Sequence, residues 1–261
     1  MQSNTQNKVK IEYNQGKLFS KPLLSMSLAV FGYMWLLLIV FLVFGALLIF
    51  GNTIISIIVN IAFLSLCGYF FYFRGLYVGT KQAAASEIAF KDKLLGKNSS
   101  VNPDECFTRW KGFVAVAFGM LPFFLVALYF ALHTERQYYQ LGSLPSWLNQ
   151  YMHYDNLDVA LGYYMQNTGL HAMDILRIFV RGSIMPFVSM ANNAGAEVML
   201  TVERLSPLLI LLVPSLYGFG YVQGENNRIQ INKAIHSNAK RKNIVENHKK
   251  EKKIQKNKEL I

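Results

Sequence analysis

Long apolar runs without a single charged residue constrain this sequence more than any other feature. Three of them cover residues 28–50, 53–73 and 113–132, and a fourth, 205–222, is shorter and contains two prolines. A membrane-spanning helix needs roughly 20 predominantly apolar residues. Prolines are tolerated in such a helix because neighbouring helices can satisfy the freed backbone groups. The four runs therefore predict an all-α membrane protein, a helical bundle with four spans.

The overall composition agrees with charge that is segregated from these runs. Charged residues make up 16% of the 261 residues, hydrophobic residues make up 52%, and the net charge is +11. Soluble domains carry about 25% charged residues. The apolar content excludes a wholly disordered chain, and two cysteines exclude a disulfide-rich scaffold.

The distribution of Lys and Arg predicts the orientation in the membrane. Residues 1–27, 74–112 and 223–261 hold 22 of the 26 Lys and Arg, and the other four are spread over 133–204. Basic loops stay on the cytoplasmic side of a membrane. We therefore expect a basic cytoplasmic N-terminal segment, a bundle over 28–222 with a cytoplasmic loop and an extracytoplasmic lid, and a basic cytoplasmic tail. The chain is typical of a bacterial plasma (inner) membrane protein.

A further apolar stretch, 175–191, contains two arginines, so its composition alone does not show whether it spans the membrane. A fifth span would put the basic tail outside, so we predict an amphipathic helix in the extracytoplasmic loop, either interfacial or re-entrant. Asp174, Arg177 and Arg181 follow helical spacing on one face. This face is a candidate functional polar face. Whether residues 172–191 span, re-enter or lie on the membrane stays open.

The first half of the lid is rich in aromatic residues, which favour the headgroup zone of a membrane. Their interpretation as an interfacial cover is favoured over a binding surface for an extracytoplasmic ligand. His153, Asp155 and Asp158 lie close in sequence, but they match no metal-ligand spacing, so a surface polar cluster is favoured over a metal site. The aromatic residues are Tyr138, Tyr139, Trp147, Tyr151, Tyr154, Tyr163 and Tyr164.

Two G-x-x-x-G steps, Gly75 with Gly79 and Gly220 with Gly224, lie at the predicted cytoplasmic ends of apolar runs. Small residues at this spacing allow helix backbones to approach closely. We therefore expect the two steps to pack against each other. The loop between residues 74 and 112 is predicted to form two short helices.

The tail from Gly224 onward has eleven basic residues, four acidic ones and no aromatic residue. Basic segments beside a membrane are attracted to anionic lipids, so membrane lipids are the expected partners of the tail. Contact with nucleic acid or a ribosome is less favoured, because no aromatic residue is present for base stacking. The candidate headgroup contacts are Arg228, Lys233, Lys240, Arg241 and Lys242.

Motifs for chemistry are missing from the sequence. It contains no H-E-x-x-H, P-loop or G-x-S-x-G motif, so we predict no catalytic residue, cofactor or metal. No Asp, Glu, Lys, Arg or His falls within the four runs, which argues against a proton-coupled transporter. The leading hypothesis is a non-enzymatic accessory or scaffold subunit with a membrane-protein partner. One alternative is a small permease or the membrane component of a transporter that uses Arg177 and Arg181. Another is an enzyme at the outer face that uses the residues His153, Asp155 and Asp158.

Overall fold

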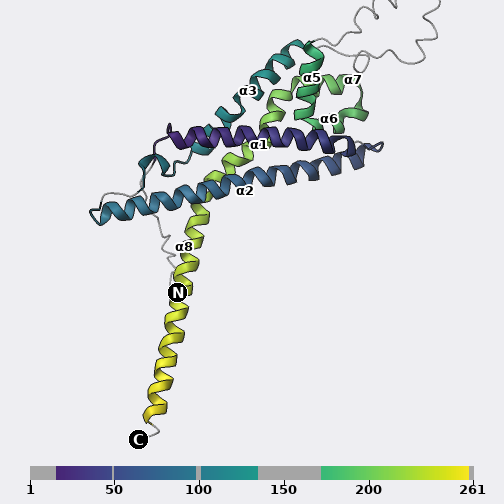
Figure 1. Cartoon of the computed structure of the whole chain (residues 1–261). Helices are drawn as coiled ribbons and strands as arrows, with labels where there is room; N and C mark the ends of the chain where they lie inside the picture. Colours follow the sequence, from purple (N-terminus) through teal and green to yellow (C-terminus); the bar gives the residue numbers. More distant parts are fainter. Residues whose placement is uncertain (1–15, 49, 98–100, 135–171, 259–261) are drawn as a thin grey trace, which may run out of the picture. The chain divides into compact units, whose positions relative to one another are not determined.

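A computed structural model of the protein describes residues 16–48, 50–97, 101–134 and 172–258 (Figure 1). Within these ranges the regular structure is helical throughout and contains no strand. The predicted all-α class is therefore confirmed for the part of the chain that is described. The aromatic residues of the predicted lid, together with the polar group at residues 153–158, lie outside the described residues.

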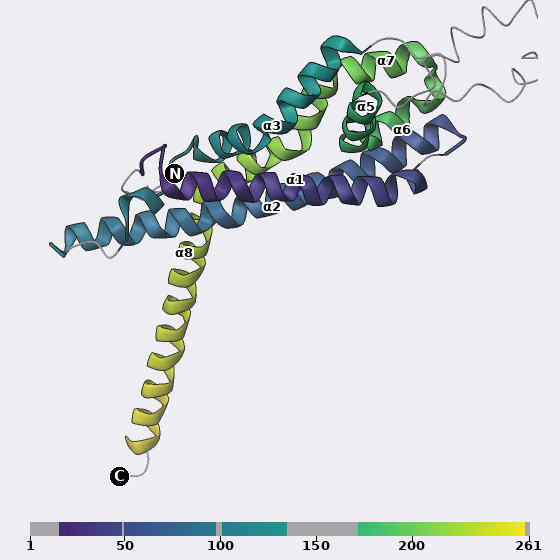
Figure 2. The same ribbon diagram turned by 45° about the horizontal axis from the view of Figure 1, so that its top comes forward.

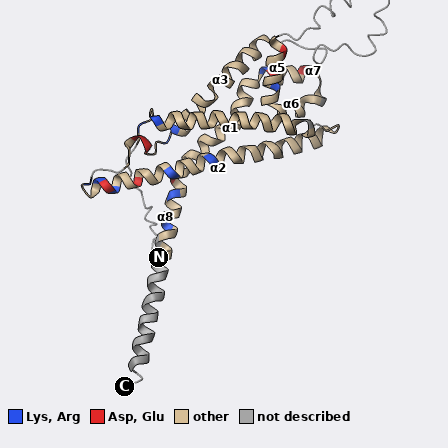
Figure 3. Cartoon of the chain, viewed as in Figure 1, with Lys and Arg blue, Asp and Glu red and all other residues tan. Residues whose placement is uncertain are grey.

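Four long helices dominate the described structure. Each is long and apolar enough to cross a membrane, α8 over its portion Ser206–Ile235. In Figure 3, α1 and α3 contain almost no charged residue along their length. The described part of the chain thus contains the predicted four helices of spanning length and hydropathy, which indicate a multi-pass membrane protein. They are α1 (Lys21–Gly45), α2 (Thr53–Leu94), α3 (Lys111–His133) and α8 (Ser206–Lys258).

Helix α2 differs from the prediction, because it does not end where its apolar run ends. Its 42 residues continue through the first part of the predicted loop to Leu94, and the chain turns at Gly96, where φ is +65°. Two short helices were expected here. The first is the continuation of α2, and in the described part of the loop after it the 3-10 turn η2 (Pro103–Glu105) is the one regular element. Charge ends an apolar run without ending a helix, and the Ala-rich stretch that follows favours helix. At about 1.5 Å per residue, α2 is roughly 63 Å long, twice the hydrocarbon thickness, so the helix is longer than a span requires and its apolar run covers only the first half.

The link between α1 and α2 is short. Helix α1 ends at Gly45, earlier than the apolar run, and the 3-10 turn η1 (Ala46–Leu48) follows it. Asn52 then caps α2, since its Oδ1 accepts the backbone N–H of Ile54 at 2.9 Å. An asparagine side chain in this position satisfies a helix N–H that has no partner within the helix.

The chain divides into two compact units, to which α2 and α8 both contribute. Unit 1 comprises residues 1–23, 72–112 and 217–261, and unit 2 comprises residues 24–71 and 113–216. Unit 1 holds the loop and the tail that are rich in Lys and Arg, whereas unit 2 holds most of the apolar helices. The two units carry different candidate sites.

Unit 2 contains three short helices between α3 and α8, which lie together in both views (Figures 1 and 2). The single helix predicted over 172–191 is broken at Ile184, because Pro186 cannot donate a backbone hydrogen bond and begins a new helix. Neither resulting helix reaches the roughly 20 residues that a span needs. The helices are α5 (Ala172–Ser183), α6 (Met185–Ala191) and α7 (Ala196–Arg204), with the 3-10 turn η5 (Asn192–Ala194) before α7.

An aromatic cluster attaches α5 to α1 and α3 within unit 2. The rings of Phe179 and Phe123 stack with centroids 5.6 Å apart, and Trp35 packs its edge against Phe123 at 5.5 Å. Val30 and Phe130 are completely buried nearby in α1 and α3. Burying large aromatic side chains is among the strongest contributions that packing makes to stability. Phe179 therefore holds α5 against α1 and α3.

Candidate functional sites

A buried ion cluster in unit 2 joins the end of α3 to α5 and α7. Arg181 donates a hydrogen bond from Nε to Oε1 of Glu203 at 2.7 Å, and its Nη2 lies 2.6 Å from the same oxygen. The Nε of Arg177 lies 3.3 Å from that oxygen as well. Thr134 donates to Oε2 of Glu203 at 2.7 Å and accepts a hydrogen bond from Nη2 of Arg177 at 3.0 Å. One carboxylate thus holds two arginines and a hydroxyl.

The charges of this cluster are buried, so each of them needs a partner to offset the cost of removing it from water. The side chain of Glu203 is 3% exposed and that of Arg177 is 7% exposed. Asp174 lies 3.8 Å from Arg177 and balances the second cation, and the guanidinium sits 5.6 Å above the ring of Phe130. Burial lowers the pKa of the Arg177 guanidinium and Glu203 raises it, but arginine stays protonated in proteins. Removing one partner from such a group leaves a buried charge uncompensated.

The cluster contains all of the predicted polar face, together with a residue that the sequence analysis missed. Asp174, Arg177 and Arg181 do lie on one face of α5, and Glu203 of α7 is the partner of both arginines. One signal was available: two arginines in an apolar stretch had a single nearby carboxylate, so charge balance required another. The arrangement connects three segments, and its charged groups are directed at one another.

A close helix crossing in unit 1 brings the two G-x-x-x-G steps together. A Cβ atom at Gly75 would overlap the carbonyl oxygen of Tyr217, and one at Gly220 would overlap the carbonyl oxygen of Tyr72. Added Cβ atoms at Gly79 and Gly224 would likewise overlap backbone atoms of the opposite helix. The backbones of α2 and α8 are therefore in contact, and only glycine fits at these four positions.

Tyr221 fixes the crossing to the neighbouring loop. Its hydroxyl donates to Oε1 of Gln82 at 2.5 Å, and its ring stacks on Phe107 with centroids 5.1 Å apart. The backbone N–H of Phe107 donates to the buried hydroxyl of Ser86 at 2.6 Å. Its carbonyl accepts the N–H of Gly16 at 3.2 Å. The loop after α2 and the segment before α1 are thus both attached to α2.

A second ion cluster lies beyond the crossing, centred on Glu87 about two helical turns after Gly79. Glu87 of α2 accepts hydrogen bonds from Lys91 at 2.7 Å, from Nε of Arg228 at 3.1 Å and from Asn232 at 2.9 Å. Burial raises the pKa of Glu87, but the hydrogen bonds from Lys91, Asn232 and Arg228 outweigh it and lower the pKa to about 2. Glu87 lies past the apolar run of α2, and it joins that helix to the polar part of α8.

We expect this cluster to make stability dependent on pH. The folded pKa of Glu87 is about 2 and the unfolded value is about 4.3, so its contribution is complete above the unfolded value and is lost as the pH falls towards 2. Glu87→Gln is expected to reduce stability by about 1–3 kcal/mol at pH 7 and by less at pH 3.5. Thermal unfolding in detergent at several pH values measures both differences. Glu105→Gln, an exposed acid in the same unit, is the control, and a deficit in Glu87→Gln that does not change with pH would contradict the assignment.

The remaining candidate residues are the predicted headgroup contacts of the tail. Arg228 binds Glu87, and Lys233 is exposed on α8. Three further candidates lie within helix α8, and their side chains are outside the described part: Lys240, Arg241 and Lys242. Among the described residues, no group of three or more His, Cys, Asp or Glu is arranged to hold a metal ion.

Comparison with known proteins adds no family. No protein-family model matches the chain, and neither a curated protein nor a solved structure matches it. The proposals below therefore depend on the geometry of the two units and on the charge distribution of the sequence.

Proposed function

We propose that this chain is a non-enzymatic accessory or scaffold subunit of a larger assembly in a bacterial plasma membrane. The observation that carries the proposal is α8, which continues as one helix to Lys258, well past its apolar part. At about 1.5 Å per residue, the part after Val222 is roughly 54 Å long. A helical arm of this length reaches farther from a membrane than the headgroups do.

The base of this arm is anchored, whereas the next turns are free to make contacts. Arg228 and Asn232 bind Glu87, and the described side chains between Lys233 and Asn238 are exposed. Isolated helices are marginal in water, and most helical stability in proteins comes from packing. A long exposed helix on a fixed base therefore supports a role in presenting a surface to a partner.

The orientation in this proposal follows from charge. Both termini and the loop after α2 are assigned to the cytoplasm, because the basic segments gather there under the positive-inside rule. The short helices α5, α6 and α7 are assigned to the outer side, where α5 is the interfacial or re-entrant helix. The basic tail then begins beside the cytoplasmic leaflet, so anionic lipids are the nearest partners of its first basic residues. A membrane-protein partner would occupy the arm.

Purification from native membranes in mild detergent tests the proposal. We expect the full-length chain to carry a partner at fixed stoichiometry, and a chain truncated after Asn238 to lose it. This truncation keeps Arg228 and Asn232, so thermal unfolding of the rest should change little. Mass spectrometry identifies the partner, and cross-links from it should map to residues 239–258. A full-length protein that purifies alone and moves a solute in liposomes would contradict the scaffold role.

The alternative of a small permease receives less support from the geometry. Its candidate residues were Arg177 and Arg181, and both bind Glu203 inside unit 2. Groups that are engaged with one another are not arranged to receive a solute.

A further inference from the structure

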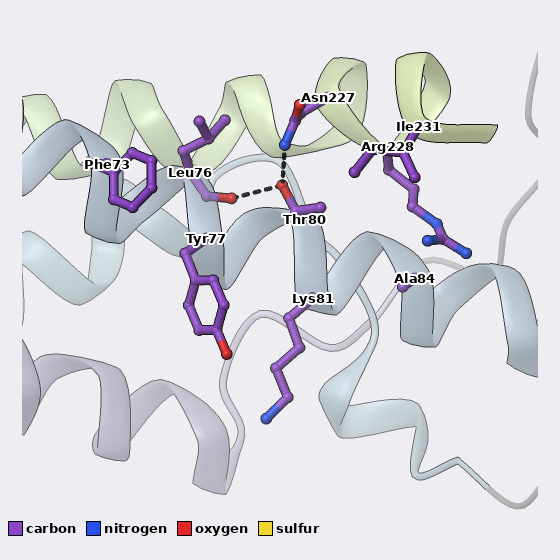
Figure 4. Close-up of a pocket in the computed structure, with 9 residues that line it drawn as sticks. All are labelled: Phe73, Leu76, Tyr77, Thr80, Lys81, Ala84, Asn227, Arg228 and Ile231. Atoms are coloured by element: carbon purple, nitrogen blue, oxygen red, sulfur yellow. Dashed lines mark hydrogen bonds between the residues drawn. The ribbon is translucent and has the colours of Figure 1, made fainter. Parts of the chain in front are cut away.

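Unit 1 contains a groove that neither the ion clusters nor the scaffold role explains. Its volume is about 490 Å³, and it lies between α2 and α8 beside the glycine crossing (Figure 4). Aromatic and aliphatic side chains line most of it, and two cations belong to its lining. The lining includes Phe73, Leu76, Tyr77, Ile231, Lys81 and Arg228.

The polar floor of the groove is already satisfied. Asn227 donates to the hydroxyl of Thr80 at 3.1 Å, and that hydroxyl donates to the carbonyl oxygen of Leu76 at 2.7 Å (Figure 4). Lys81, by contrast, is exposed and makes no hydrogen bond or ion pair with the described residues. Arg228 uses its Nε for Glu87, and a guanidinium has four further N–H donors. Two cationic groups are therefore available to an anion.

The position of the groove along α2 matches the surface of a bilayer. Phe73 ends the apolar run, Tyr77 is 62% exposed one turn later, and Lys81 follows after another turn. Figure 4 shows Tyr77 and Lys81 extending on the same side of α2. Tyrosine favours the interfacial zone, and lysine places its charge at the level of the headgroups while its stem stays against apolar surface. The groove thus runs from hydrocarbon depth to headgroup depth.

We propose that this groove binds one phospholipid with an anionic headgroup. The acyl chain lies along Phe73, Leu76 and Tyr77, and the phosphate is bound by Arg228 and by the long, exposed side chain of Lys81 when it turns towards the groove. The carboxylate of Glu87 does not repel it strongly, because Lys91 and Arg228 both neutralise that charge. An apolar groove that also has two cations in its lining is complementary to an anionic lipid, and a neutral chain or an acidic peptide matches only half of it. The proposal requires that α2 and α8 cross a bilayer and is independent of the scaffold role.

Native mass spectrometry of the full-length protein in detergent tests this site with phosphatidylglycerol and with phosphatidylcholine of the same acyl chains. We expect one phosphatidylglycerol to be retained in preference to phosphatidylcholine. Lys81→Gln should weaken phosphatidylglycerol binding about fivefold, the factor that corresponds to about 1 kcal/mol per basic residue near an anionic surface. Ala84→Phe, which fills the groove without changing charge, should reduce binding as well.

Matched controls separate this site from general attraction to a basic protein. Lys93→Gln removes an exposed lysine from the same helix outside the groove, and it should leave binding unchanged. Equal retention of the two lipids, or equal losses in Lys81→Gln and Lys93→Gln, would overturn the proposal. Displacement of the lipid by an equal concentration of glycerol phosphate would also overturn it, because the site would then recognise a soluble anion. Thermal unfolding of each variant verifies that the fold is intact.

Discussion

The substitution Gly220→Leu is expected to separate α2 from α8 and to lower the free energy of unfolding by about 3 kcal/mol or more. A Cβ atom at this position meets the backbone of Tyr72 and not a flexible side chain. Overpacked sites usually lose about 1–3 kcal/mol when neighbours can adjust. A helix backbone cannot move aside without breaking the crossing, so the loss should lie at or above this range.

Thermal unfolding in detergent and a cysteine pair at positions 80 and 227 measure the effect. The native side chains there are hydrogen-bonded, so cysteines introduced in a background without Cys67 and Cys106 should cross-link readily. The cross-link should fail when Gly220→Leu is added. Gly32→Leu is the matched control, because a Cβ atom at Gly32 meets nothing within 4 Å. Equal effects of the two leucines would show that the crossing does not hold unit 1 together.

The substitution Glu203→Gln is expected to destabilise unit 2 by about 3–5 kcal/mol, the usual loss when one partner of a buried ion pair is removed. Arg177 then stays buried and loses its ion pair with Glu203, while the more distant contact with Asp174 at 3.8 Å remains. Arg181 is 26% exposed and can turn towards solvent. The loss of stability therefore arises mainly from the buried charge of Arg177. Because the cluster joins three segments, local unfolding of α5 and α7 should precede that of the longer helices.

Two further variants isolate the charge effect. Glu197→Gln makes the same chemical change at an exposed position of α7 and should alter stability by less than about 0.5 kcal/mol. Adding Arg177→Met to Glu203→Gln should recover part of the loss, since the uncompensated cation is removed. Thermal unfolding and hydrogen exchange of α5 and α7 measure the cycle. Strict additivity of the two changes would refute the coupling between Arg177 and Glu203.

The sequence was sufficient where the physical rule is local. Uncharged runs of membrane length identified the four long helices, and the spacing of Asp174, Arg177 and Arg181 identified one face of α5. The two glycine steps were found in the same way, because the small-residue spacing is itself the signal. Glu203 was not found, because its role depends on a tertiary contact with arginines more than twenty positions earlier, and helical periodicity carries no information about such a contact.

Two boundaries show a different limit. The first charged residue after an apolar run was taken as the end of α2, yet the helix continues to Leu94, because helix propensity and hydropathy are separate properties. In the opposite case, the segment 172–191 was taken as one helix, but Pro186 divides it. The groove between α2 and α8 was beyond prediction, since its shape depends on how closely the two helices approach.

The continuity of α8 has a mechanical consequence. A helix that is not interrupted after Val222 transmits a change of direction at its base along its whole length, as a rod does. At about 1.5 Å per residue, a tilt of about 10° would move the end at Lys258 by roughly 9 Å. Small rotations at the glycine crossing would therefore be amplified at the far end of the arm, and the ion pairs of Glu87 restrain that rotation at the pivot.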